Sequence, residues 1–397
     1  MKKGWQTKTI GDVCEFQRGL TYAKGDEVDV SDNVVLRATN IDLATNLLIF
    51  DELKYISEKV VVPESKKVKK GSLMICMASG SKSHLGKVAF IDDDYGYAFG
   101  GFMGMLTPVN GLWPKYLFHL MTSEDYKDFI GALSDGANIN NLTFDKLKVF
   151  PVPVPPLAEQ QRIVGLLDEA FEGLATAKAN AEKNLQNARA LFESHLQSVF
   201  TQRGPGWVEN TLGEICDFSQ GVQVDVKLQS DIRKDQSQVR FLRIIDFTQG
   251  NDPERFIDNP GEKFLVCQSD ISLVRYGAST GFVCRGLEGA IANNLFRVIP
   301  KDGHVSKDFL YWFLKSPAFQ DEIKEIMNGA AMPAISFGVI NEICIAFLPQ
   351  RDQLAIVNKL ELFAEESQRL AHIYERKLAA LAELKKSLLH QAFTGEL

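Results

Sequence analysis

A chain of 397 residues is long enough to form two or more globular cores of ordinary size. Its composition is 45% hydrophobic and 24% charged, as in soluble globular proteins, and no apolar run approaches the roughly 18 residues needed to cross a bilayer. The net charge of −7 argues against a uniformly basic surface for binding nucleic acid, so any such surface must be a local patch or be shared with a basic partner.

The N-terminus and the cysteines indicate a cytoplasmic protein. Met1-Lys2-Lys3 carries the positive charge of a signal peptide, but no apolar stretch follows it. The cysteines are far apart and form no Cys-x-x-Cys pair, so we expect buried thiols rather than disulfides or metal ligands. The histidines are also scattered, and we expect no metal site. The cysteines are Cys14, Cys76, Cys216, Cys267, Cys284 and Cys344.

Residues 1–155 are predicted to form an α+β domain. Short apolar runs alternate with Gly, Asp and Asn, as strands and turns do. Val34–Leu36 and Ser72–Cys76 read as strands, and Pro114 to Phe129 reads as helical.

A long helix is predicted to follow the proline-rich segment 151–156, giving a spacer over residues 156–203. No further proline occurs up to about Thr201, and apolar residues recur every three or four positions along one face. The prolines suit a strand that leads into a helix start, although such a segment can also serve as a polyproline ligand. The predicted stripe is Ile163, Leu167, Phe171, Leu174, Leu185, Phe192 and Leu196.

The same order then recurs. Residues 204–348 are predicted to form a second α+β domain, and residues 349–397 a second helical spacer beginning at Pro349. A helix of about 45 residues is a rod of roughly 65 Å that needs a partner along its length. The two helices can supply each other's partner as an antiparallel intramolecular coiled coil. The second stripe is Val357, Leu360, Phe363, Leu370, Ile373, Leu381, Leu384 and Leu388.

An internal repeat supports this layout. The segment from Trp5 to Gly19 returns 202 positions later with Trp, Thr, Gly, Cys, Phe and Gly in register. Later matches, such as Gln160 with Gln353, have an offset of 193, so the second copy is nine residues shorter between them. The ends of the two copies agree while their middles diverge, which indicates one scaffold with two different recognition surfaces.

Three features together resemble the specificity subunits of type I restriction-modification systems. They are the Trp followed by Leu/Ile-Gly-Asp/Glu-Ile/Val in both copies, the segment Pro155–Val164 that leads into a long helix, and the ending Leu388–Leu397. The resemblance covers the whole chain. The second helix departs from the family's Pro-Leu-x-Glu-Gln form, because it begins Pro349-Gln350-Arg351-Asp352-Gln353.

The resemblance implies a non-catalytic subunit whose two α+β domains are target recognition domains. Each would read one half of a bipartite, asymmetric site in double-stranded DNA. The helices would set the spacing and dock two methyltransferase subunits, and nuclease-translocase subunits would join the complex. S-adenosylmethionine, ATP and Mg²⁺ would be bound by those partners. An alternative is a non-catalytic coiled-coil scaffold that binds proteins rather than DNA.

Catalytic motifs give no competing signal. The sequence lacks an Asp/Asn-Pro-Pro-Tyr/Phe motif, a phosphate-binding G-x-x-x-x-G-K-[ST] loop and a G-x-G-x-x-G fingerprint. The glycine-rich segment Phe99–Gly104 reads as a packed strand or tight turn, and Asp51–Lys54 as a solvated turn. A free-standing enzyme is therefore the least supported class.

Candidate DNA contacts are polar or basic residues near predicted loops. Each set has a structural alternative: a surface hairpin for the matched Ser/Gly loops, a solvated face for the lysines, and repeated salt bridges for the two arginines that follow a leucine. Gln220, Gln223, Asn138, Asn140 and Asn141 cannot be ranked. The candidates are Arg37, Lys66, Lys67, Lys69, Lys70, Ser79, Ser81, Lys82, Arg243, Arg275, Tyr276, Ser279 and Thr280.

Overall fold

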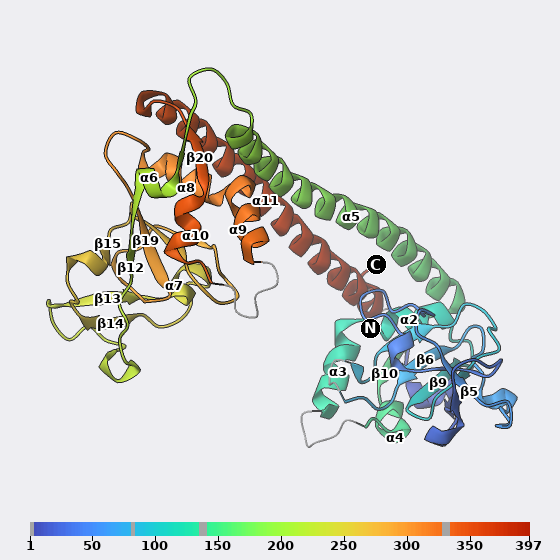
Figure 1. Cartoon of the computed structure of the whole chain (residues 1–397). Coiled ribbons are helices and arrows are strands. Elements are labelled where there is room, and N and C mark those ends of the chain that lie inside the picture. The colour runs from blue at the N-terminus through green and yellow to red at the C-terminus, as the bar shows by residue number, and fades with distance from the viewer. Residues whose placement is uncertain (1–3, 81–83, 135–140, 328–333) are drawn as a thin grey trace. The chain divides into compact units, whose positions relative to one another are not determined.

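The computed structural model describes residues 4–80, 84–134, 141–327 and 334–397 (Figure 1). The chain forms two compact units, and each combines a globular domain with part of both long helices. The first unit contains the chain up to Ala181 together with Arg376–Leu397, and the second contains Glu182–Glu375. We call their globular parts domain 1 and domain 2.

Domain 1 is built on two four-stranded sheets and one strand pair. Strand β1 pairs antiparallel with β10, which joins the start of the domain to its end. One sheet has the order β2-β9-β6-β7 and is antiparallel, and the other has the order β3-β5-β4-β8 with β4 and β8 parallel. The strands are β1 Gln6–Thr9, β2 Cys14–Arg18, β3 Glu27–Val28, β4 Val34–Leu36, β5 Lys54–Ile56, β6 Leu73–Cys76, β7 Val88–Phe90, β8 Ala98–Phe99, β9 Met103–Pro108 and β10 Pro151–Val154.

Short helices complete domain 1 and cover its core. The buried residues Leu73 and Ile75 of β6 pack with Tyr116 of α2 in a cluster that also contains residues of both long helices. The helices are α1 Ile10–Val13, α2 Pro114–Leu120, α3 Glu124–Ser134 and α4 Phe144–Lys148, with 3-10 turns η1 Lys24–Asp26, η2 Ala38–Asn40 and η3 Glu64–Lys66.

Domain 2 repeats the strand pair and one of the two sheets of domain 1. Strands β11 and β20 pair as β1 and β10 do, and one sheet has the matching order β12-β19-β16-β17. The other, β14-β13-β18-β15, keeps one parallel pair, β13 with β18. The strands are β11 Val208–Thr211, β12 Cys216–Gln220, β13 Gln238–Leu242, β14 Arg255–Asp258, β15 Leu265–Val266, β16 Ile271–Val274, β17 Val283–Cys284, β18 Gly289–Ile291, β19 Leu295–Pro300 and β20 Cys344–Phe347. The helices are α6 Leu212–Ile215, α7 Ile244–Thr248, α8 Lys307–Lys315, α9 Pro317–Met327 and α10 Phe337–Glu342, with 3-10 turns η5 Val226–Leu228 and η6 Glu262–Phe264.

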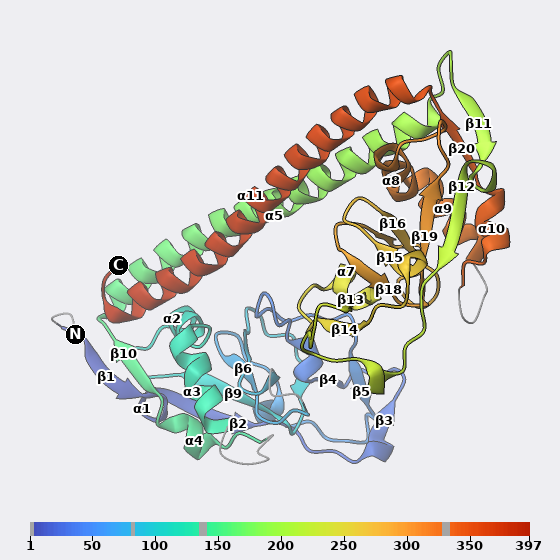
Figure 2. The same ribbon diagram turned by 90° about the vertical axis from the view of Figure 1, so that its left-hand side faces the viewer.

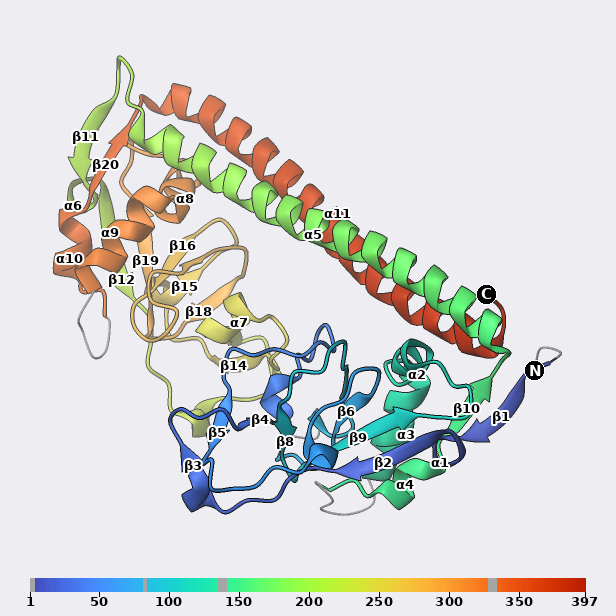
Figure 3. The same ribbon diagram turned by 90° about the vertical axis from the view of Figure 1, so that its right-hand side faces the viewer.

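The two long helices, α5 (Leu157–Thr201) and α11 (Gln350–Thr394), run antiparallel (Figures 2 and 3). In the first unit the start of α5 and the end of α11 share the core of domain 1. In the second unit the end of α5 and the start of α11 share the core of domain 2. There the Ser367 hydroxyl donates to the Ala188 carbonyl at 2.7 Å, and Arg189 pairs with Glu375 at 2.7 Å. This confirms two α+β domains with an antiparallel coiled coil.

The prediction that residues lie in the seam between the two helices is wrong for three of them. Leu370, Ile373 and Leu384 are 38%, 46% and 47% exposed. Along α11 the partly buried positions include 367, 371, 374, 378 and 381, which alternate steps of four and three. Leu370 and Ile373 each precede a seam position by one residue, a turn of about 100° away from the partner helix. The prediction followed large aliphatic side chains, whereas this part of the seam uses Ser367, Ala371 and Tyr374.

The other predicted seam residues are buried or partly buried. Ile163, Leu167, Leu196, Val357 and Leu360 are at most 3% exposed. The partly buried ones are Phe171, Leu174, Leu185, Phe192, Phe363, Leu381 and Leu388. The predicted apolar stripe of this helix also includes Ala181 and Ala188, which are 0% and 8% exposed. Small side chains let two helix backbones approach closely. Within the described ranges, no helix is both long and apolar enough to cross a membrane.

Candidate nucleic-acid interface

In each domain the chain passes very close to the backbone of another segment directly after one strand, and this close strand crossing requires a glycine. Strand β2 ends at Arg18 and is followed by Gly19, while β12 ends at Gln220 and is followed by Gly221. A Cβ atom at Gly19 would lie 2.0 Å from the carbonyl oxygen of Gly100, and one at Gly221 would lie 2.2 Å from that of Ala292. Only glycine fits such an approach, so the repeated glycines fix where the strand-end side chains stand.

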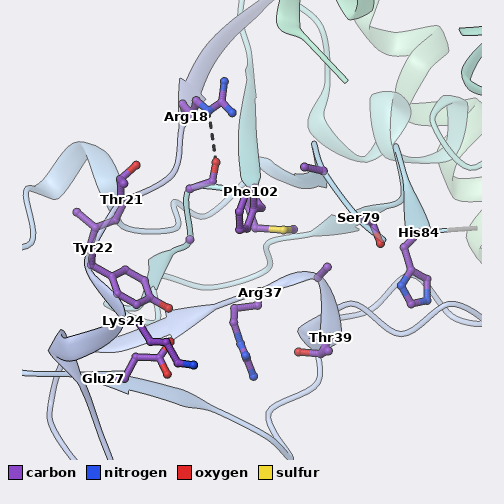
Figure 4. Close-up of a pocket in the computed structure, with 16 residues that line it drawn as sticks. Arg18, Thr21, Tyr22, Lys24, Glu27, Arg37, Thr39, Ser79, His84 and Phe102 are labelled. Atoms are coloured by element: carbon purple, nitrogen blue, oxygen red, sulfur yellow. Dashed lines mark hydrogen bonds between the residues drawn. The ribbon is translucent and has the colours of Figure 1, made fainter. Parts of the chain in front are cut away.

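A cavity of about 820 Å³ opens beside this crossing in domain 1. Three basic side chains, Arg18, Lys24 and Arg37, help to line it, together with the aromatic ring of Phe102 (Figure 4). Among the described lining residues the one carboxylate belongs to Glu27, which pairs with Lys54 at 2.5 Å. The cavity is therefore locally basic in a chain of net negative charge, as a site for an anionic ligand must be.

Phe102 stands out in this lining because 71% of its surface is exposed. It lies in the turn between β8 and β9, and its carbonyl accepts hydrogen bonds from the backbone N–H groups of Met77 and Ala78 at 2.9 and 3.2 Å. The backbone is held while the ring is left free. The reading of Phe99–Gly104 as packed structure is right for Phe99, which is fully buried, and wrong for Phe102.

The two candidate arginines occupy matching positions but differ in their surroundings. Each precedes a short helix and donates its backbone N–H to the side chain three residues on, Asn40 for Arg37 and Asp246 for Arg243, at 2.8 and 2.7 Å. The Arg243 guanidinium pairs with Asp246 at 3.1 Å and with Asp252 at 2.8 Å. Arg243 therefore has the structural salt bridge that was the alternative reading. Arg37 lines the cavity, and its buried Nε has no hydrogen-bond partner among the described residues.

The lysine cluster is largely engaged within domain 1. Lys66 donates to the carbonyl of Arg18 at 2.8 Å, Lys67 pairs with Glu64 at 2.5 Å, and Lys70 lies 3.7 Å from Asp93. Lys69 is exposed. Acidic neighbours thus neutralise part of the charge that the sequence displays as a run, and phosphate contact by this cluster stays a prediction.

The matched polar loops are only partly described. Ser79 lines the domain 1 cavity, whereas Ser81 and Lys82 lie outside the described residues, as do Asn138 and Asn140. In domain 2 the Arg275 Nε donates to the carbonyl of Ile335 at 3.3 Å, and its guanidinium lies 5.7 Å from the centre of the Phe337 ring.

Residues 276–282 form a tight turn. Tyr276 forms an isolated antiparallel bridge with Ala334, as Ala78 does with Asn141 in domain 1. The Thr280 hydroxyl donates to the carbonyl of Gly277 at 2.6 Å, and the carbonyl of Ser279 accepts from the Phe282 N–H at 3.0 Å. Both hydrogen bonds close the turn on itself, so DNA contact by these residues stays a prediction.

Sequence reasoning missed Arg18 and Phe102 and could not rank Gln220. A signal was present for two of them. Arg18 and Gln220 stand 202 positions apart, each directly before the repeated glycine, and both side chains are exposed. No sequence pattern distinguishes the exposed Phe102 from the buried Phe99.

The cysteines are all free. Burial raises the pKa of the thiols of Cys14, Cys216 and Cys284 to about 12, so they stay protonated at neutral pH. The expectation of buried thiols is wrong for Cys267 and Cys344, which are exposed. In the part of the chain that the structure describes, no three His, Cys, Asp or Glu side chains are grouped as a metal ion would need.

Comparison with known proteins supports the resemblance seen in the sequence. Residues 2–185 match the family model for the type I restriction modification DNA specificity domain. The StySPI specificity subunit of Salmonella potsdam and the EcoKI specificity subunit of Escherichia coli (strain K12) are each 26% identical to this chain, over 100% of it and 90% of the relative.

Two solved structures share the fold. One, described as the structural basis of complex assembly and conformational transition of the type I R-M system, has a TM-score of 0.83 at 19% identity and covers 100% of this chain and 99% of that chain. The other, the HsdS subunit from Thermoanaerobacter tengcongensis, has a TM-score of 0.64 at 19% identity, over 100% of this chain and 98% of that chain.

These similarities define a DNA specificity protein. The chain is similar along its length to the specificity subunits of type I restriction-modification systems, which confirms the resemblance found in its sequence. The comparisons give no support to the alternative of a scaffold that binds only proteins.

Proposed function

We propose that domains 1 and 2 each read one half of a bipartite, asymmetric DNA site. The observation that carries this proposal is the combination of a repeated framework with unlike side chains. Gly19 and Gly221 mark the same close strand crossing, yet the side chain before the glycine is Arg18 in one domain and Gln220 in the other. A framework used twice with different exposed side chains suits two readers of different base sequences.

The charge distribution supports binding at a local patch. The domain 1 cavity gathers Arg18, Lys24 and Arg37, although the whole chain carries a net charge of −7. Most non-specific affinity for DNA comes from neutralising phosphates. This chain therefore supplies selectivity, and basic partner subunits supply much of the remaining affinity.

The chain acts without catalysing a reaction, within a complex that contains two methyltransferase subunits and nuclease-translocase subunits. The specificity-subunit names of its relatives and the absence of catalytic motifs from the sequence support this role. S-adenosylmethionine, ATP and Mg²⁺ bind to those partners rather than to this chain. The complex works in the cytoplasm, where its DNA is. Helices α5 and α11 set the distance between the half-sites and present the docking surface for the methyltransferases.

The test is a genome-wide map of N6-methyladenine in the source strain with the gene intact and deleted. A split, asymmetric motif that disappears on deletion supports the proposal and supplies both half-sites. An unchanged methylation pattern contradicts it. In that case, purification of the chain with its bound proteins, followed by DNA-selectivity measurements, distinguishes an orphan reader from a scaffold.

A further inference from the structure

We propose that Arg18 and Gln220 are equivalent base-reading side chains, and that Arg18 selects guanine in one half-site while Gln220 selects adenine in the other. This inference rests on the proposed function, because it names the bases that the two domains read. It requires equivalent placement of the two side chains, free hydrogen-bonding groups on both, and a chemical match to different bases.

The placement is equivalent in each respect that the structure records. Arg18 and Gln220 are the last residues of β2 and β12, the outer strands of two sheets with the same order. The following glycines donate their N–H groups to the carbonyls of Met103 and Leu295, in both cases at 3.0 Å. The two side chains therefore leave the same point of the same framework.

Each side chain also makes the same stabilising contact. The Nε of Arg18 donates to the carbonyl of Gly101 at 3.3 Å, and the Nε2 of Gln220 donates to the carbonyl of Asn293 at 3.3 Å (Figure 4 shows the first). Gly101 follows the bridge residue Gly100, and Asn293 follows the matching bridge residue Ala292. One hydrogen bond thus orients each side chain before any ligand arrives. Binding then costs less conformational entropy, because the side chain is already ordered.

The contact leaves the informative part of each side chain available. The Arg18 side chain is exposed, and its bond to Gly101 uses one of the five N–H donors of a guanidinium. The terminal nitrogens form the planar fork that binds O6 and N7 of guanine in the major groove. Gln220 is also exposed and uses one amide hydrogen in its bond to Asn293. Its Oε1 and second amide hydrogen are the pair that recognises N6 and N7 of adenine.

Neighbouring groups support a reading role over a merely structural one. In domain 1 the lining beside Arg18 contains the exposed ring of Phe102 and the guanidinium of Arg37, suited to an apolar base face and a phosphate. In domain 2 the Asn293 side-chain amide donates to Oε1 of Gln223 at 3.3 Å, so a second amide lies next to Gln220. The surroundings match the side chains: a second guanidinium lies near Arg18, and further amides lie near Gln220.

The experiment exchanges the two side chains in the full chain. The reconstituted complex with its methyltransferase is prepared as wild type, Arg18→Gln and Gln220→Arg. Its binding is measured by competition among duplexes that carry each base pair at each position of the wild-type motif. Arg18→Lys tests whether the planar fork is needed, and Lys69→Gln is the control, since loss of an exposed charge outside the cavity alters affinity for all sequences alike.

We expect wild type to prefer guanine at one position of one half-site by roughly 5- to 100-fold, the range for one bidentate base contact. Arg18→Gln should remove that preference or shift it toward adenine and leave the other half-site unchanged. Gln220→Arg should do the converse in the other half-site. Arg18→Lys should weaken the guanine preference without moving it, and Lys69→Gln should change no preference.

Two outcomes overturn the inference. One is a set of base preferences that is the same in both exchange variants as in wild type. The other is an equal loss of selectivity at both half-sites in exchange variants whose thermal unfolding matches that of wild type. If wild type itself shows no split motif, the proposed function fails as well. If wild type shows the motif and the exchanges leave it unchanged, only the assignment of Arg18 and Gln220 fails.

Discussion

Gln160 and Gln353, 193 positions apart in the chain, make the same three hydrogen bonds in the two units. The Oε1 of Gln160 accepts the backbone N–H of Trp113 at 2.7 Å, while its Nε2 donates to the carbonyls of Gly111 and Pro155 at 3.1 and 2.9 Å. The Oε1 of Gln353 accepts the backbone N–H of Ser306 at 2.8 Å, and its Nε2 donates to the carbonyls of His304 and Leu348 at 2.8 and 2.9 Å. Each glutamine thereby ties the first turn of a long helix to the globular domain that precedes it.

Replacing this glutamine should loosen one domain and spare the other. Gln160 is 1% exposed, and Gln160→Leu removes the partner of the Trp113 N–H and of the Gly111 and Pro155 carbonyls, at a cost of about 2–4 kcal/mol in the free energy of unfolding. Exchange of the Trp113 amide hydrogen with solvent should accelerate, and that of Ser306 should not. Gln353→Leu should give the reverse pattern. The neighbouring exposed Gln161, changed to Leu, is the control and should cost less than about 0.5 kcal/mol.

The glycine at each strand crossing should tolerate no side chain. Gly19→Ala places a Cβ 2.0 Å from a backbone oxygen that cannot move without disturbing β8, so we expect a loss of about 3 kcal/mol or more in unfolding free energy. The same change at Gly25, where an added Cβ meets nothing within 4 Å, should have almost no effect. Denaturant unfolding of the two variants checks this. A similar stability for both would show that the crossing is adaptable.

The corrected seam predicts which leucines of α11 contribute to stability. Leu360 is fully buried in the core of the second unit, so Leu360→Ala should cost about 2–5 kcal/mol. Leu354 is 62% exposed on the same helix, and Leu354→Ala should cost less than about 1 kcal/mol. Thermal unfolding of both variants provides the comparison. Equal losses would mean that Leu354 contributes as much packing as Leu360.

The repeat made much of the fold predictable because the same physical requirement occurs twice. A close strand crossing needs glycine at 19 and at 221, and a helix start buried against a domain needs an amide at 160 and at 353. Identical residues at matching positions are visible in a single sequence. The exact seam positions of α11 were harder to predict from the sequence, because the middle of the seam uses small residues such as Ala371 instead of the adjacent Leu370.

The binding surface was harder to predict because its residues differ between the copies. Arg18 and Gln220 share no residue type, and only the structure shows that both bond to the same backbone position. Charges were also misleading. The lysine run looks basic in sequence, but folding brings Asp93 beside Lys70, and Asp252 beside Arg243. Such pairings depend on segments far apart in the chain or on loop conformation, which periodicity does not report.

A buried histidine should make domain 1 sensitive to mild acid. His119 is 4% exposed, and burial lowers its pKa below the usual 6.5 despite the Asp168 carboxylate 2.9 Å from Nε2. Because the unfolded chain binds the proton more readily, stability should fall as the pH drops below about 6.5, by at most about 1.4 kcal/mol per pH unit. The decline should end at the folded-state pKa.

The variant His119→Gln tests this origin of the acid sensitivity. It removes the titrating group, so its unfolding free energy should change less than that of wild type between pH 7.5 and 5.5. Asp168 adds no competing trend in this range. Burial raises the pKa of its carboxyl group, but hydrogen bonds from Lys115 and His119 lower it by more, so that the pKa lies below 3.8. An identical pH dependence in wild type and variant would assign the sensitivity to other groups.

Lengthening both long helices should lengthen the unread DNA between the half-sites. Four residues add about 6 Å to a helix, and one base pair adds about 3.4 Å to a duplex, so inserting four residues into the middle of both α5 and α11 should add one or two base pairs to the spacer. Insertion into α5 alone is the control. It should destabilise the protein instead, because the seam positions of one helix then no longer face those of the other. Methylation mapping of the double insertion reads out the spacer directly, and an active complex with the original spacer would show that the helices do not set the distance.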